Sequence, residues 1–96
     1  MDVSRFIRTG DFCEIVTDKF TDIGVKRGQH VYVAGHKALP ISEEDPYTQR
    51  IKFLVHTMEG DIVKVKDLYL MDANSLLKVD EGKQEYLLAC NANSAS

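Results

Sequence analysis

The amino-acid sequence predicts a small all-β domain in which five short strands form a barrel. Three observations lead to this prediction. Apolar residues alternate with polar ones in several short stretches, which is typical of strands with one buried face. Glycine, proline and small polar residues separate these stretches at intervals of about 8–12 residues. The chain has 96 residues, which is enough for one domain with a modest hydrophobic core.

The first predicted strand runs over residues 12–17 and follows a Gly-Asp turn. Cys13 and Ile15 share one face of it, and Glu14 lies on the other, so we expect Cys13 and Ile15 to point into the core. The connection over residues 18–28 contains three large apolar residues and is expected to fold back over one end of that core. These residues are Phe20, Ile23 and Val25.

A basic turn precedes the second predicted strand. Lys26 and Arg27 lie between two glycines, and the strand over residues 30–34 follows. Residues 36–48 are predicted to form a long, extended and irregular loop, because two prolines interrupt them and the acidic run at 43–45 suits a solvated segment. Loops of this length are often functional, so we expect this one to take part in binding.

The next two predicted strands, over residues 49–57 and 61–66, form a hairpin. A three-residue loop, Met58-Glu59-Gly60, sets Val55 opposite Val63 and keeps the apolar residues of both strands on one face. Gly60 is then expected to have a positive φ. The same register sets pairs of outer-face residues opposite each other: Lys52 with Lys66, and Leu54 with Lys64.

The rest of the chain is less regular. A short apolar strand is predicted within residues 67–71, and residues 76–79 are either a final strand or one helical turn. The sequence thus divides into an N-terminal arm over 1–9, a barrel over 10–79 and a short polar C-terminal tail over 80–96, which we expect to be partly disordered.

Composition restricts the class of protein. The net charge is −3, from 12 basic and 15 acidic residues, which is the reverse of the balance usual in nucleic-acid-binding proteins. The two cysteines, Cys13 and Cys90, form no CxxC motif and are expected to be free thiols, Cys13 buried and Cys90 accessible. No apolar run approaches the length of a membrane span, and no secretory leader is recognisable, so we expect a cytoplasmic protein that does not bind membranes.

Catalytic and metal-binding motifs are not expected. The histidines His30, His36 and His56 have no close ligand spacing with one another or with Cys13. A buried Cys13 behaves as a small hydrophobic group and not as a nucleophile. The consecutive carboxylates at 43–45 suit a solvated loop better than an acid/base pair. The sequence therefore predicts no enzyme, no metal and no cofactor.

A resemblance to known families adds to this interpretation. The resemblance is carried by Gly10-Asp11-Phe12-Cys13-Glu14-Ile15-Val16, Gln29-His30-Val31-Tyr32-Val33 and Leu70 to Val79. Through these segments, residues 10–79 resemble SH3-like small barrels of the KOW and Tudor-like kind, and the later part is similar to the closing strand of small barrels in bacteriophage proteins. The resemblance implies an SH3-like fold and, for a phage protein, a place in the host cytoplasm or the virion. No functional residue is carried over from it.

We therefore expect a non-catalytic protein-interaction or structural module that binds another protein or itself. An outer patch of Leu54, Ile62 and Tyr32 suits a small interface. The alternative is a KOW-like nucleic-acid-binding domain that uses a basic outer hairpin face. The candidate partner-binding residues are Lys26, Arg27, Tyr47, Lys52, Leu54, Lys64 and Lys66.

Overall fold

The computed structural model describes residues 7–42 and 44–94, which form one antiparallel sheet with a helix at its side. The part of the chain described is mostly β, as predicted. Its elements, in chain order, are β1 (Phe12–Ile15), the 3-10 turn η2 (Thr21–Ile23), β2 (His30–Ser42), β3 (Asp45–Glu59), β4 (Ile62–Val63), β5 (Tyr69–Asp72), the 3-10 turn η3 (Ala73–Ser75), β6 (Leu76–Lys78) and α1 (Glu81–Ser94).

The sheet has the strand order β4-β3-β2-β1-β6, and β5 pairs with β3 beside this path. The described strands number six and do not close into a barrel, which corrects the predicted five-stranded barrel. The sheet stays open because β6 pairs with β1 and β5 pairs with β3, but no pairing among the described residues joins β6 to β4 or β5. β2 has 13 residues and β3 has 15, so both also continue far beyond their neighbours.

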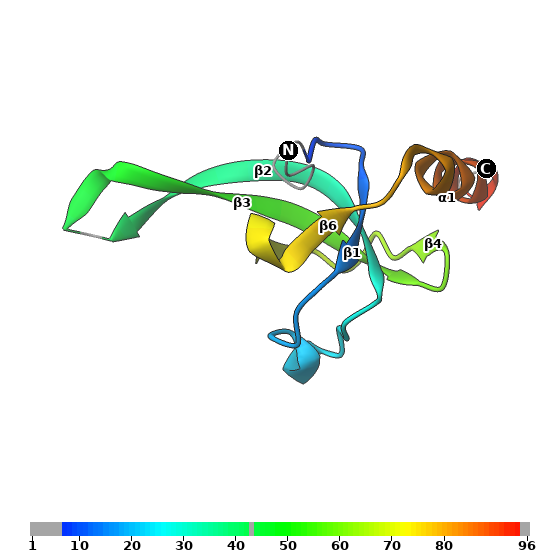
Figure 1. Cartoon of the computed structure of the whole chain (residues 1–96), viewed down its shortest axis with the longest axis horizontal. Coiled ribbons are helices and arrows are strands. Elements are labelled where there is room, and N and C mark those ends of the chain that lie inside the picture. The colour runs from blue at the N-terminus through cyan, green and yellow to red at the C-terminus, as the bar shows by residue number, and fades with distance from the viewer. Residues whose placement is uncertain (1–6, 43, 95–96) are drawn as a thin grey trace.

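The distal halves of β2 and β3 form a two-stranded projection, which we call the β-ribbon (residues 36–42 and 45–51). Figure 1 shows it leaving the body of the protein at the end opposite α1. The β-ribbon replaces the irregular loop predicted over 36–48. Pro40 is tolerated in it, because Pro40 pairs with Gln49 on one side and no described strand flanks β2 on its other side there.

One face of the sheet carries the main hydrophobic core, which we call the inner core. Cys13 and Ile15 are fully buried in it, as the strand alternation predicts. Val25 is buried and Phe20 packs against the core, so the connection over 18–28 does cover one end, although Ile23 stays exposed. The inner core consists of Ile7, Cys13, Ile15, Val25, Val31, Val33, Phe53, Val55, Met71 and Leu76.

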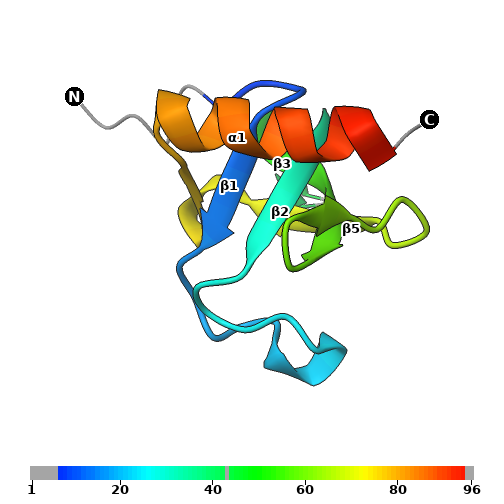
Figure 2. The ribbon, with the colours of Figure 1, turned by 90° about the vertical axis from the view of Figure 1, so that its right-hand side faces the viewer.

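The C-terminal segment is a helix, which corrects the predicted polar tail. Asp80 begins it by accepting a 2.8 Å hydrogen bond from the backbone N–H of Lys83, a typical N-cap contact. Helix α1 runs across β1 and β2 on the face opposite the inner core (Figure 2), which we call the outer face. Leu87 is buried there against Phe12 and Met58.

The predicted hairpin register is wrong, although Gly60 does have a positive φ of 60°. Met58 pairs with Val63 and Glu59 with Ile62, so the loop contains two residues. β4 ends at Val63, and β5 takes the neighbouring position along β3. The prediction failed because it treated Met58 as a loop residue, whereas α1 covers Met58 and makes its strand position favourable.

The cross-strand pairs expected on the outer face are therefore also wrong. Lys52 lies between Lys37 on β2 and Asp72 on β5, and not opposite Lys66. Leu54 lies between Gly35 and Leu70, and not opposite Lys64. Lys52 therefore still has a like-charge neighbour, Lys37, but the carboxylate of Asp72 on its other side offsets that repulsion.

Candidate functional site

Three rings form a row across the outer face of the sheet. Phe12 of β1 pairs with Tyr32 of β2, and Tyr32 pairs with His56 of β3. The centroids of Phe12 and Tyr32 are 5.1 Å apart, and those of Tyr32 and His56 are 6.4 Å apart with nearly parallel planes. The Nδ1 atom of His56 lies 2.6 Å from the backbone carbonyl of Asp67. This contact orients the imidazole and holds the row in place.

Two side-chain amides attach α1 to the sheet beside this row. Gln84 accepts a hydrogen bond from the backbone N–H of Phe12 (2.7 Å) and donates one to its carbonyl (2.8 Å), as a neighbouring strand would. Asn91 accepts a 2.8 Å bond from the N–H of Val63 and donates a 2.9 Å bond to the carbonyl of Asp61. Seven residues span about two helical turns, so both amides project from the same face of α1.

A groove of about 560 Å³ lies between α1 and the outer face. Its surface is mainly apolar, and several of the residues around it are exposed: Val65 is 73% exposed and Leu88 is 50% exposed. We call this hollow the apolar groove. It is lined by Phe12, Tyr32, His56, Ile62, Val63, Val65, Leu88, Asn91 and Ala92.

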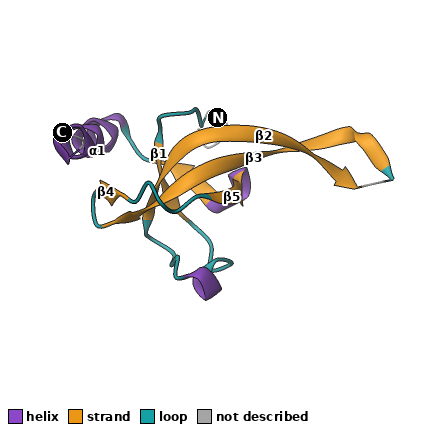
Figure 3. Ribbon diagram, turned by 180° about the vertical axis from the view of Figure 1, so that it is seen from behind, coloured by secondary structure: helices purple, strands orange, loops and turns teal. Residues whose placement is uncertain are grey.

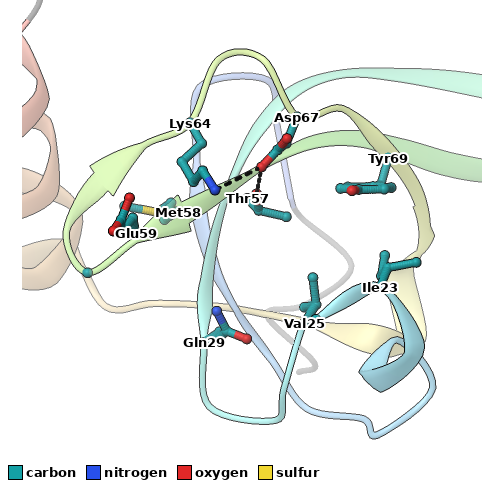
Figure 4. A pocket seen from close by; sticks show the side chains of 11 residues that line it. Ile23, Val25, Gln29, Thr57, Met58, Glu59, Lys64, Asp67 and Tyr69 are labelled. Atoms are coloured by element: carbon teal, nitrogen blue, oxygen red, sulfur yellow. Dashed lines mark hydrogen bonds and ion pairs between the residues drawn. The ribbon is translucent and has the colours of Figure 1, made fainter.

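A second hollow, of about 380 Å³, lies between the η2 connection and the β3–β5 region (Figure 4). Its polar groups bind one another. Thr57 donates a 2.8 Å hydrogen bond to Asp67, and the Nζ atom of Lys64 lies 3.4 Å from the same carboxylate. The hydrogen bond from Thr57, with the charge of Lys64, holds the pKa of Asp67 below its usual value. Because these polar groups already bind one another, fewer of them are available to bind a ligand than the composition of the pocket suggests.

The predicted partner-binding residues do not form one patch. Arg27 binds the carboxylate of Asp18 at 3.2 Å and the carbonyl of Val16 at 3.0 Å, so its charge is engaged within the turn. The remaining predicted residues lie on separate elements. Lys26 is exposed beside Arg27, and Lys64 and Lys66 are in the segment between β4 and β5. Leu54 is on the outer face, Lys52 is paired with Asp72 at the base of the β-ribbon, and Tyr47 is near the tip of the β-ribbon.

Sequence reasoning missed the contribution of α1 to the groove. The signal is nevertheless present, because residues 84, 87, 88 and 91 follow the i, i+3, i+4, i+7 spacing of one helix face. The end positions of this pattern are amides and not apolar residues, which hides it from a search for hydrophobic periodicity. Of the outer patch predicted from the sequence, Tyr32 and Ile62 do line the groove.

The cysteines and acidic groups show no metal-binding arrangement in the described residues. Within residues 7–42 and 44–94, no three His, Cys, Asp or Glu side chains gather closely enough to hold a metal ion. Burial, with a smaller effect from Asp11, raises the pKa of the Cys13 thiol to about 12. Cys13 is thus a neutral thiol near pH 7, and both cysteines are free of disulfides.

No helix in the described part of the chain has the length and apolar character that crossing a membrane requires. Comparison with known proteins adds no relative: no family model, no curated protein and no solved structure matches this chain.

Proposed function

We propose that this protein is a non-catalytic interaction module that binds an apolar segment of a protein chain in the apolar groove. The observation that carries this proposal is the groove itself. It leaves Val65 and Leu88 exposed around a row of buried and half-buried rings. Clustered exposed apolar side chains of this kind are a cost in solution unless something covers them.

The volume and chemistry of the groove suit a protein segment. At about 560 Å³ it lies within the range of specific binding pockets, and it offers His56 and Asn91 as polar groups at its wall. Both polar groups already contact backbone atoms, which fixes their orientation before any ligand arrives. A preorganised apolar groove with a few oriented polar groups favours an apolar side chain carried on a peptide.

We also propose that the fold is an open variant of the SH3-like barrels that the sequence resembles. Two features support this. The strands β1, β2 and β3 are sequential antiparallel neighbours, and the last strand, β6, returns to pair with β1. Such a return is the step by which a small sheet begins to close. The long β-ribbon is the part that departs from a compact barrel.

Nucleic-acid binding is the second candidate, and one observation favours it. Lys37 and Arg50 are exposed on the β-ribbon and make no ion pair with any described residue. β-Ribbons are a known type of groove-binding element in DNA-binding proteins, and exposed basic residues on them can contact DNA. The net charge of −3 and the engagement of Arg27, Lys52 and Lys64 by carboxylates weigh against it.

Selection from a random peptide library tests the proposal. Peptides that bind the wild-type protein are expected to contain a large apolar residue and to lose binding to the double variant Val65→Glu/Leu88→Glu. Both substituted positions are exposed, so the fold is expected to survive. The matched control is Lys37→Glu/Arg50→Glu, which leaves the groove intact and is expected to keep peptide binding. Submicromolar nucleic-acid binding lost only in that control variant would overturn the ranking.

A further inference from the structure

We propose that the segment which fills the apolar groove is the tip of the β-ribbon from a second copy of this chain, so that copies associate head to tail. This inference rests on the proposed function and names the occupant of the groove. It follows from three properties of the chain: the placement of the two surfaces, the exposed apolar residues of the β-ribbon, and the charges beside each surface.

The two surfaces lie at opposite ends of the molecule. The β-ribbon projects at one end of the long axis, and α1 and β4 lie at the other, as the view from behind also shows (Figure 3). The chain measures 46 Å along its longest direction and 25 Å along its shortest. The tip therefore does not reach the groove of its own chain, and a contact between them needs a second copy.

The tip carries unusually exposed apolar side chains. Tyr47 is 93% exposed and Ile41 is 54% exposed. A two-stranded ribbon with solvent on both faces is marginally stable alone, and large apolar groups on it gain little from folding. Their burial in another chain would stabilise both the side chains and the ribbon. An aromatic and a branched aliphatic residue match the apolar lining of the groove in kind.

The charges near the two surfaces are complementary. Glu44 is exposed at the tip, and both of its sequence neighbours are also acidic. Lys66 follows the groove residue Val65, is exposed, and makes no ion pair with another described residue. Opposite charges beside an apolar contact set its orientation and increase its rate of formation more than its strength.

Such a contact joins two different surfaces and is heterologous. Each copy that offers its tip to a neighbour still has an empty groove, so association continues into a ring or an open filament and does not stop at a symmetric pair. This property separates the inference from a two-fold dimer and provides its test.

The experiment uses sedimentation velocity on two variants of the full chain. The tip variant is Ile41→Ser/Tyr47→Ser, and the groove variant is Val65→Glu/Leu88→Glu; all four positions are exposed. The average mass of the wild-type assemblies is expected to increase with protein concentration. Each variant alone is expected to associate at least about tenfold more weakly, since each lacks one of the two surfaces. Ile23→Ser removes an exposed apolar residue of the other pocket and is expected to leave association unchanged.

A mixture of the two variants provides the decisive test of head-to-tail association. The tip variant keeps its groove and the groove variant keeps its tip, so an equimolar mixture is expected to form a one-to-one complex that grows no further. A wild-type protein that is monomeric up to its solubility limit, or a mixture that stays monomeric while the wild type associates, would overturn the inference. If the wild-type protein is monomeric but library peptides bind its groove, this inference alone fails. If the wild-type protein is monomeric and no library peptide binds its groove, the proposed function fails as well.

Discussion

The two faces of the sheet are stabilised by different means. The inner core buries aliphatic side chains from almost every element, and Ile15, Val31, Val33 and Val55 are completely inaccessible in it. Among the described residues, the outer layer under α1 buries Phe12, Met58 and Leu87 and no more, and it depends on the amides Gln84 and Asn91 to hold the helix. Apolar burial tolerates small shifts, whereas a hydrogen bond requires a particular distance and angle.

This difference predicts a difference in local stability. Few apolar contacts and a small number of side-chain hydrogen bonds are characteristic of segments that open before the whole domain unfolds. Helix α1 forms one wall of the apolar groove, so an opening of α1 would change the groove without disturbing the inner core. The predictions below begin with the inner core and proceed to smaller effects outside it.

The largest effect is expected from Ile15→Ala. This change removes three carbons from a fully buried position and leaves a cavity, at a cost of about 3 kcal/mol in the free energy of unfolding. Chemical denaturation followed by circular dichroism measures this cost. The matched control is Leu77→Ala on the neighbouring strand β6, where the side chain is exposed and the expected cost is below about 1 kcal/mol. Equal costs for both variants would contradict the assignment of the inner face.

The inner face is also the part that the sequence predicts well. Alternation in the first strand identified Cys13 and Ile15 as inward, and both are fully buried. Alternation fails where burial occurs on both faces: Phe12 and Met58 lie on the outer face but are covered by α1. The register of the predicted hairpin, now β3 and β4, was wrong for the same reason, because amides at the ends of the helical pattern in α1 hide its hydrophobic periodicity.

The candidate site was predictable only in part. The predicted outer patch was Leu54, Ile62 and Tyr32; Ile62 and Tyr32 line the groove, and Leu54 does not. The basic surface expected beside it does not form. Lys64 is paired with Asp67, only three residues further along the chain, whereas Lys52 is paired with Asp72, which is brought close by the pairing of β5 with β3. The charge of this surface therefore depends in part on long-range strand pairing, which local patterns do not contain.

The second prediction addresses the outer layer. Gln84→Ala removes both hydrogen bonds to Phe12 and leaves its buried N–H without a partner, at a cost of about 2 kcal/mol. Hydrogen exchange is expected to show increased opening of α1 with little change in the inner strands. The control is Glu85→Ala, an exposed position on the same helix, with an expected cost within about 0.5 kcal/mol. Uniformly faster exchange in both layers would show that α1 and the inner core open together.

The third prediction concerns the turn that brings β4 beside α1. Gly60 has a φ of 60°, where a side chain is strained although no atom lies near the position that a Cβ would occupy. Gly60→Ala is therefore expected to cost about 1 kcal/mol through backbone strain alone. Thermal unfolding measures this cost. Gly35→Ala is the control for steric crowding without backbone strain, because its Cβ would lie 3.7 Å from a side-chain carbon of Leu54 and its φ is not in the left-handed region. An unchanged stability of Gly60→Ala would mean that the turn relaxes without cost.

The smallest effect belongs to a third kind of contact, an ionic one at the base of the β-ribbon. Asp72 accepts a 2.8 Å hydrogen bond from Lys19 and lies 2.5 Å from the Nζ atom of Lys52. The hydrogen bond from Lys19, followed by that from Lys52, lowers the pKa of Asp72 to about 2. A carboxylate with a lowered pKa in the folded state stabilises the fold at pH values above its unfolded pKa of 3.8. This contribution is lost as the pH falls through about 2.

Asp72→Asn is expected to cost about 1 kcal/mol near neutral pH, a value reduced by solvent screening of the lysines, and almost nothing at about pH 2. Urea unfolding of both proteins between these pH values measures the difference. Asp18→Asn, which removes a more exposed pair with Arg27, is expected to show a smaller and flatter difference. A cost for Asp72→Asn that does not change with pH would mean that the carboxylate acts through shape and hydrogen bonding and not through its charge, and the β-ribbon would then be attached to the body in the same way as α1.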